Sequence, residues 1–300
     1  SWECAYPALQ DALDEANAGS GAFEIRVAQG TYYPDIDNVD NSGDGAIDHT
    51  NDDRTESFTF ARDGISLLGG YPSGGGTRDP ETNPVTLSGD IDADNGGADS
   101  AFEPNVDSDG VTSTPPQTDH IVGGNAYHVV ELDGVTGSIT SSTLIDGVTI
   151  SGGLADGSFP ENAGGGIYCD ASASSAECSP SLTGLRIQGN AGQFGGGVFL
   201  NTDPNTGSAG TSSPTFKDVD FVGNAAEEFR GGAVHMSIVS GGVVRPRFDR
   251  VVFNNNFAAT RGGALHVNAR EGSTAEPLVA NGLFLRNRSS NGGALYIRAS

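Results

Sequence analysis

Apolar and polar residues alternate along the second half of the chain, in segments that recur at a nearly constant spacing. Each segment places proline seven residues before Phe or Ile, and asparagine three residues after it. The four segments are residues 180–190, 214–224, 246–256 and 277–287. A Gly-Gly motif with a further alternating run starts at Gly164, Gly195, Gly231, Gly262 and Gly292, at intervals of 31, 36, 31 and 30 residues. Because period-two alternation is typical of strands, the pattern predicts a repeat built from short strands.

Units of this length and without a helical period cannot each bury a core. Stacking them strand on like strand does bury one, so the repeat predicts an all-β solenoid of parallel sheets. Weaker strand patterns extend towards the N-terminus, between long loops rich in Gly and Asp. They lie at residues 58–60, 65–68, 85–87, 127–130 and 145–153.

The first residues of the chain have a helical pattern instead. Tyr6, Leu9, Leu13 and Ala16 fall on one face of a helix over residues 5–17. We expect this helix to cap the N-terminal end of the solenoid. The chain is then one domain: cap helix and first strand (1–30), irregular turns with acidic loops (31–143) and regular turns (144–300). No cap pattern follows Ile297, so the last turn is expected to be open.

The two paired motifs resemble the repeats of chlamydial polymorphic outer-membrane proteins and related bacterial surface β-helix proteins. Segments 9–13, 27–32, 68–71, 78–79 and 87–91 are similar to the leading region of such secreted proteins. The resemblance covers most of the chain. It implies a right-handed, single-stranded parallel β-helix, export, surface display and often an adhesive role, without implying one particular activity.

Two sets of repeated residues are candidates for ladders that run from turn to turn. Asparagines at equivalent turns are expected to bond their amides between turns and to tolerate left-handed backbone; they are Asn190, Asn224, Asn256 and Asn287. Alternation sends a row of rings away from the core; its members are Tyr168, Phe199, His235, His266 and Tyr296. This row is either an exposed strip that binds a sugar or a partner, or a row covered by neighbouring loops. His235 and His266 could also hold a metal, although no acidic residue lies nearby.

Composition narrows the choice of partners. The chain carries 15 basic and 39 acidic residues, a net charge of −24, and its pI is near 4.2. Such acidity argues against nucleic acid and anionic membrane surfaces as partners. No apolar run approaches the roughly 18 residues of a membrane helix, so no membrane insertion by this segment is expected.

Acidic loops predict calcium as a cofactor. Residues 40–51 fit much of a calcium-loop pattern, with ligands at Asp40, Ser42, Asp44, Asp48 and Asn51. A second oxygen-rich cluster contains Asp90, Asp92 and Asp94. Oxygen ligands without sulfur suit a hard cation. The alternative is that both are solvated loops of an acidic protein.

The three cysteines suggest at most one bond within the chain. Cys169 and Cys178 enclose eight residues, a loop that a disulfide closes if the geometry allows. The alternative is three unrelated buried thiols. Cys4 has no partner left within the chain.

Three functions remain open at this stage. The first is a non-catalytic secreted or cell-surface scaffold, adhesin-like or structural, whose calcium-ordered loops meet a surface glycan or a protein ligand. The second is a self-assembling subunit of an extracellular filament or sheath, joined to copies of itself through the open C-terminal turn. The third is a polysaccharide lyase or glycosidase of the pectate-lyase-like class. Asn201-Thr-Asp203 resembles one pectin-hydrolase motif, but its companion motifs are missing, and the single Lys217 lies in a repeat position. We therefore expect no catalytic residues, and an extracellular or cell-surface location.

Overall fold

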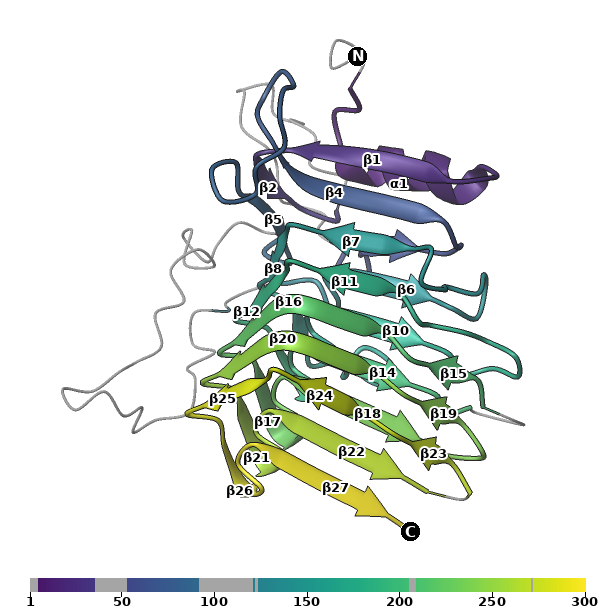
Figure 1. Cartoon of the computed structure of the whole chain (residues 1–300), viewed down its shortest axis with the longest axis vertical. Helices are drawn as coiled ribbons and strands as arrows, with labels where there is room; N and C mark the ends of the chain where they lie inside the picture. Colours follow the sequence, from purple (N-terminus) through teal and green to yellow (C-terminus); the bar gives the residue numbers. More distant parts are fainter. Residues whose placement is uncertain (1–4, 36–52, 92–120, 122–123, 205–208, 271) are drawn as a thin grey trace, which may run out of the picture.

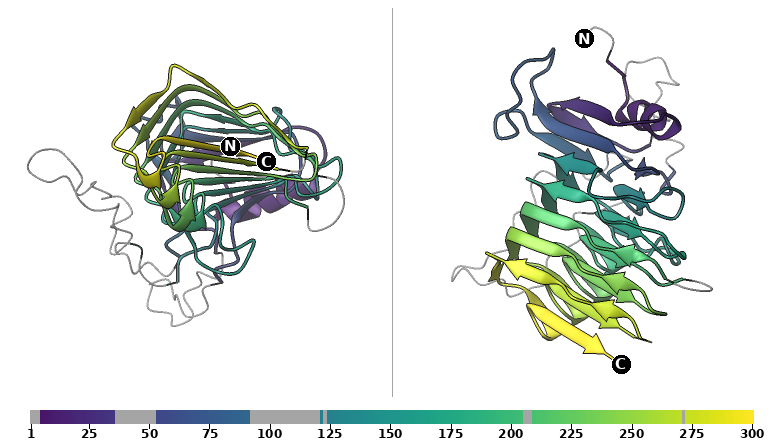
Figure 2. Two further views of the ribbon diagram at one scale, coloured as in Figure 1. Left: turned by 90° about the horizontal axis from the view of Figure 1, so that it is seen from below. Right: turned by 45° about the vertical axis from the view of Figure 1, so that its right-hand side comes forward.

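Short strands wind into turns that stack from the N-terminal to the C-terminal end (Figure 1). The computed structural model describes residues 5–35, 53–91, 121, 124–204, 209–270 and 272–300. Every strand pairing in these ranges is parallel. The turns lie over one another when the molecule is viewed along the stack (Figure 2). The chain is therefore a parallel β-solenoid, and the fold predicted from the repeat is confirmed.

The largest sheet has two columns of strands, which β16 and β20 join by passing through both. The first column is β1 (Phe23–Ala28), β4 (Ile65–Tyr71), β7 (Leu144–Asp146), β11 (Ser181–Thr183), β16 (Thr215–Val222), β20 (Arg247–Asn254) and β24 (Leu278–Ala280). The second adds β2 (Gly30–Tyr32), β5 (Val85–Ser88), β8 (Thr149–Ser151), β12 (Arg186–Gln188) and β25 (Leu283–Leu285).

Three further sheets complete the turns. The sheet that carries the outer row of rings contains β3 (Phe58–Phe60), β6 (Val130–Asp133), β10 (Ile167–Asp170), β14 (Val198–Asn201), β18 (Val234–Ile238), β22 (Leu265–Ala269) and β27 (Leu295–Ala299). The next contains β9 (Leu154–Ala155), β13 (Ala191–Phe194), β17 (Ala225–Arg230), β21 (Phe257–Arg261) and β26 (Arg288–Asn291). The smallest contains β15 (Thr211–Ser212), β19 (Val243–Val244) and β23 (Thr274–Ala275).

The interior is filled by columns of equivalent side chains. Phe221 lies in register with Ile187 on one side and with Phe253 on the other. The rings of Phe221 and Phe253 stack at 4.8 Å, and those of Phe216 and Phe248 at 4.9 Å. All four rings are fully buried. In-register pairing of identical residues therefore builds a core of repeated contacts, as the repeat predicted.

The four repeated asparagines form a continuous ladder. Their Nδ2 groups donate to the Oδ1 of the next asparagine at 3.0 Å from Asn190, 3.0 Å from Asn224 and 2.9 Å from Asn256. Each Nδ2 also donates to a carbonyl of the preceding turn, as from Asn224 to Ile187 at 2.8 Å. The left-handed backbone falls one residue before each asparagine, at Gly189, Gly223, Asn255 and Arg286. The expectation that the ladder asparagines themselves occupy this conformation was wrong, since none of the four has a positive φ.

The Gly-Gly motif is explained by two different needs. Its first glycine has a positive φ, 70° at Gly231, which other residues adopt at a cost. At the second glycine the backbone of the next turn approaches closely. A Cβ on Gly232 would lie 2.2 Å from the Phe257 carbonyl oxygen. Both positions therefore require glycine for stacking.

Helix α1 (Leu9–Ala18) lies at the N-terminal end and packs on β1 and β3. Leu9, Leu13 and Ala16 are buried against the core, as the helical pattern predicted. The expected start at residue 5 was wrong. Tyr6 precedes the helix and is 49% exposed, because the helix begins only at Leu9, after Ala8 in extended backbone. Within the described part of the chain, no helix is long and apolar enough to cross a membrane.

Candidate functional site

A column of six rings runs along the outer face of the sheet that contains β10, β14, β18, β22 and β27. Neighbouring ring centroids are 4.7–5.8 Å apart, and the rings are nearly parallel. Alternation places them opposite inward residues such as Val198 and Leu200. We call this column the outer row; its members are His128, Tyr168, Phe199, His235, His266 and Tyr296. Five of them were predicted. His128 was missed because it lies before β6, whereas the strand position in register with Tyr168 is occupied by Glu131.

The outer row is largely covered by other parts of the chain. Tyr168 and Phe199 are each 3% exposed, and His266 is fully buried. Phe194 covers His235 edge-on at 5.5 Å and stacks on Phe229 at 4.7 Å. The prediction of an exposed ring strip is therefore wrong for these members, and the covered alternative holds. Alternation fixed the direction of these rings but not what lies over them.

Three carboxylates lie at the N-terminal end of the same outer face. Glu131 is in register with Tyr168, and Asp133 is in register with Asp170. Burial raises the pKa of Glu131, and the charges of Asp133 and Asp170 raise it further. Burial also raises the pKa of Asp170.

These carboxylates have structural partners. Asp170 accepts hydrogen bonds from Asn201 Nδ2 at 3.0 Å and from the Ser172 backbone at 2.9 Å. Glu131 accepts one from Ser57 at 3.4 Å. Carboxylates with raised pKa values are the groups that general acid catalysis uses. Here, however, Asp170 and Glu131 accept hydrogen bonds from neighbouring residues of the same chain.

Arginines gather at the other end of the outer face. Burial, together with the charges of four guanidinium groups, lowers the pKa of His266 to about 3. These belong to Arg230, Arg261, Arg270 and Arg298. Such positive charge opposes a cation at His235 and His266, so the idea that this pair holds a metal loses its support. Sequence reasoning missed the arginines, although Arg230 and Arg261 each directly precede a Gly-Gly motif.

The buried His128 predicts a pH-dependent stability. Burial lowers its pKa from the ordinary 6.5 to about 4. As the pH falls below 6.5, the unfolded chain binds a proton there and the folded chain does not, so stability decreases. At pH 5 the expected loss is about 2 kcal/mol. Denaturant unfolding at pH 7 and pH 5 should show a smaller decrease for His128→Phe, which keeps a ring against Tyr168. Equal decreases in both proteins would contradict the assignment.

Most of the predicted calcium ligands lie outside the described residues. These are Asp40, Ser42, Asp44, Asp48, Asn51, Asp92 and Asp94. Asp90 is described and is 4% exposed; its backbone N–H donates to Ser88 Oγ at 3.2 Å. Among the described residues, no three His, Cys, Asp or Glu side chains are grouped so as to hold a metal. Calcium therefore stays a prediction.

The cysteines of the predicted short loop are joined. Cys169, in β10, forms a disulfide with Cys178. Both are buried in the main core, and Cys178 lies beside Ile139 in a single parallel bridge. The bond therefore ties one loop of the solenoid to its own turn. Cys4 lies outside the described residues.

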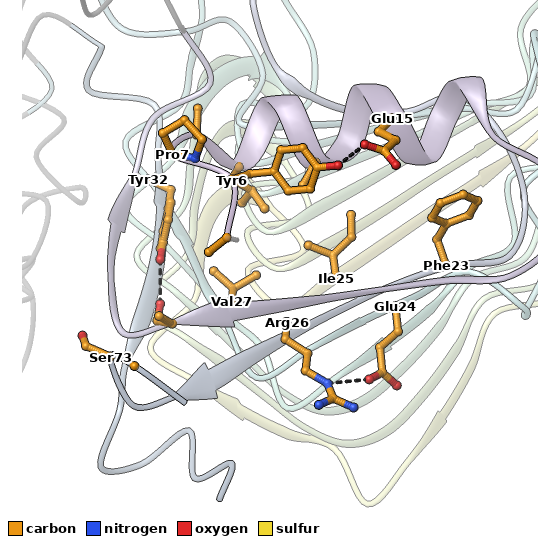
Figure 3. A pocket seen from close by; sticks show the side chains of 16 residues that line it. Tyr6, Pro7, Glu15, Phe23, Glu24, Ile25, Arg26, Val27, Tyr32 and Ser73 are labelled. Carbon is orange, nitrogen blue, oxygen red and sulfur yellow. Dashed lines mark hydrogen bonds and ion pairs between the residues drawn. The ribbon is translucent and has the colours of Figure 1, made fainter. Parts of the chain in front are cut away.

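An open pocket of about 610 Å³ lies between α1 and β1. Figure 3 shows Phe23, Ile25 and Val27 pointing towards the helix, while Glu24 and Arg26 point away and form an ion pair at 2.7 Å. Tyr6 donates a hydrogen bond to Glu15 across the pocket (Figure 3). The pocket thus lies at the N-terminal end of the solenoid, where α1 does not fully cover the apolar side chains of β1.

One comparison with known proteins bears on the repeats. The Chlamydia polymorphic membrane protein (Chlamydia_PMP) repeat matches residues 250–268, from the second half of β20 through most of β22. This segment contains both repeated motifs, Phe253 with Asn256 and the Gly-Gly motif at Gly262. No curated protein and no solved structure matches the chain significantly. Residues 250–268 thus carry a repeat of the Chlamydia polymorphic membrane protein type, set within a parallel β-solenoid.

Proposed function

We propose that this chain is a surface-exposed, non-catalytic scaffold of the adhesin-like kind. One observation carries the proposal: the segment that matches a polymorphic membrane protein repeat is part of one turn in a stack where equivalent residues serve packing. Stacked turns present long outer faces, which repeat proteins commonly use for binding. The partner is a surface glycan or a protein, and the location is extracellular.

Hydrogen bonding within the chain supports the non-catalytic part of this proposal. Asp170, a carboxylate with a raised pKa, is held by Asn201 and Ser172. Asn201 also donates to the Tyr168 hydroxyl at 2.9 Å and is 1% exposed. The Asn201-Thr-Asp203 segment therefore contributes to sheet structure through its first residue.

Retention on immobilised polysaccharides tests the proposal. Beads carrying the whole chain are applied to dextran, chitin, polygalacturonate and heparin surfaces, and released reducing ends are measured in parallel. We expect retention on at least one surface without release of reducing ends. Release would overturn the non-catalytic role. Absence of retention on all four would overturn the glycan-binding form of the proposal.

Calcium is proposed as the cation of the loop at residues 40–51. Its four regularly spaced side-chain oxygens lack the usual final glutamate, so we expect weak binding, in the range of about 10⁻⁴–10⁻³ M. Calorimetric titration of the chelator-treated chain should show uptake that Asp44→Ala weakens. Asp203→Ala, which removes an acid outside both predicted clusters, is the control. Equal isotherms for the wild type and Asp44→Ala would contradict the loop assignment.

Self-association is a second candidate, favoured by a single observation. Six large apolar side chains of the last described turn are exposed by 37–59%. They are Leu278, Val279, Leu283, Leu285, Leu295 and Ile297. Sedimentation of the chain over a range of concentrations, beside an Ile297→Glu variant, distinguishes assembly from a monomeric scaffold.

A further inference from the structure

Charge is distributed very unevenly along the chain. Residues 230–300 contain nine arginines and three acidic residues, a net charge of +6. Residues 1–229 contain six basic and 36 acidic residues, a net charge of −30. The C-terminal turns therefore form a basic region on an acidic protein, and positive potential there is not a consequence of overall composition.

Four of these arginines converge on the end of the outer row, and we call them the arginine cluster. Arg230 and Arg261 end β17 and β21 and lie in register on neighbouring turns. Arg261 lies over the ring of Tyr296 at 5.1 Å. Arg298 is in register with Asn268, whose Oδ1 accepts a hydrogen bond from Arg270 at 3.2 Å. Arg230 and Arg261 thus lie at strand ends, Arg270 follows β22, and Arg298 lies within β27, all on consecutive turns.

The arginine cluster has no acidic counterpart within the described residues. None of its four side chains takes part in an ion pair there, although exposed arginines of the same turns do, such as Arg250 with Asp218 at 2.6 Å. Like charges also lower the pKa of Arg230, after burial itself. All four residues are half-buried, so each still reaches the surface.

Buried polar atoms beside the cluster also lack partners. They are Arg230 Nε, His235 Nδ1 and both ring nitrogens of His266, again among the described residues. His235 is 2% exposed and His266 fully buried. An unsatisfied buried polar group costs about 1–3 kcal/mol, so native structures rarely leave several together. Half-buried guanidinium groups without acidic partners match what an anion requires.

We propose that the arginine cluster, which lies beside the buried His235 and His266, binds the sulfate or carboxylate groups of an acidic polysaccharide. The arginines lie on turns about 4.8 Å apart, so a chain of anionic sugars can contact several of them at once. Guanidinium groups bind such oxygens through paired N–H donors. Residues 1–229, with a net charge of −30, repel a long stiff polyanion such as duplex DNA. This inference deepens the proposed function and rests on it, because the extracellular location is where the chain would encounter such a polysaccharide.

Binding of a heparin octasaccharide to the full chain is the test, measured by calorimetry at low salt. The variant is Arg230→Gln/Arg261→Gln. The control is Arg245→Gln/Arg247→Gln, which removes the same charge from exposed arginines of a neighbouring turn. We expect the first to weaken binding by about tenfold or more and the control by less than about twofold. Circular dichroism of each variant verifies folding.

Further arms identify the chemistry. An octamer of galacturonate has carboxylates as its only anionic groups, and inorganic sulfate is a single small anion. We expect the octamer to bind and the sulfate ion to bind much more weakly. In the unmodified chain, heparin should shift the imidazole NMR signals of His235 and His266. Absent shifts, equal losses in both variants, or equally tight binding of a DNA duplex would overturn the proposal. Retention on dextran or chitin alone would overturn it too, while leaving the scaffold function intact.

Discussion

Asn224→Ala is expected to lower the free energy of unfolding by about 3–5 kcal/mol. Asn224 is fully buried, and its Nδ2 donates to Ile187 O at 2.8 Å and to Asn256 Oδ1 at 3.0 Å. Its Oδ1 accepts from Asn190 Nδ2 at 3.0 Å. Alanine removes these bonds and leaves the partner groups buried without hydrogen bonds. Such unsatisfied groups destabilise the fold more than the loss of the hydrogen bonds alone would. Chemical denaturation followed by circular dichroism measures the change.

Asn162→Ala is the control for this prediction. Its side chain is half-buried and donates one hydrogen bond, to Gln193 Oε1 at 3.1 Å. The expected loss is below about 1 kcal/mol. If both substitutions lowered stability equally, the ladder would contribute no more than an ordinary surface amide, and its structural role would have to be abandoned.

Phe221→Ala should lower the free energy of unfolding by a similar amount, about 3–5 kcal/mol. Phe221 is fully buried and stacks on Phe253 at 4.8 Å, and it also meets Phe216 edge-on at 5.5 Å. The column is held by turns on both sides, so the site cannot collapse easily and a cavity remains. The measurement is again the unfolding free energy at pH 7.

Two companion variants separate packing from other effects. Phe221→Leu keeps most of the buried volume and should cost less than about 1.5–2 kcal/mol. Phe159→Ala removes a ring that is 48% exposed and meets only Phe199, at 6.3 Å, among described rings. It should change stability by less than about 1 kcal/mol. A loss for Phe159→Ala as large as that for Phe221→Ala would show that the interior stack is not what stabilises the turns.

The fold could be predicted because the same residue types recur at the same place in each turn. Phe221 and Phe253 share one position of the repeat, and the structure stacks them in register. Asn224 and Asn256 share another, and the structure joins their amides. A residue that repeats in this way has the same neighbours above and below, so its role can be inferred from its place in the repeat.

The candidate site was less predictable, because equivalent positions of the repeat carry different residue types there, as Phe194 and Arg230 do. Phe194, at the end of β13, covers His235 and stacks on Phe229 of β17, and no alternation pattern indicates such a cover. Arg298 and Arg230 are far apart in sequence, and the stacking of turns brings their charges close enough to interact. The arginines directly before two of the Gly-Gly motifs, Arg230 and Arg261, were the signal available for half of the cluster.

The in-register ladder makes the length of this molecule adjustable in whole steps. Because Asn190, Asn224 and Asn256 bond to one another in the same way, a duplicated or deleted turn would leave its neighbours with equivalent partners. An insertion within a strand would instead shift the following side chains of that strand out of register with their columns. Duplication or loss of complete units is therefore the change in length that evolution can make most easily. It alters the distance between the two ends of the solenoid and leaves the packing of the interior unchanged.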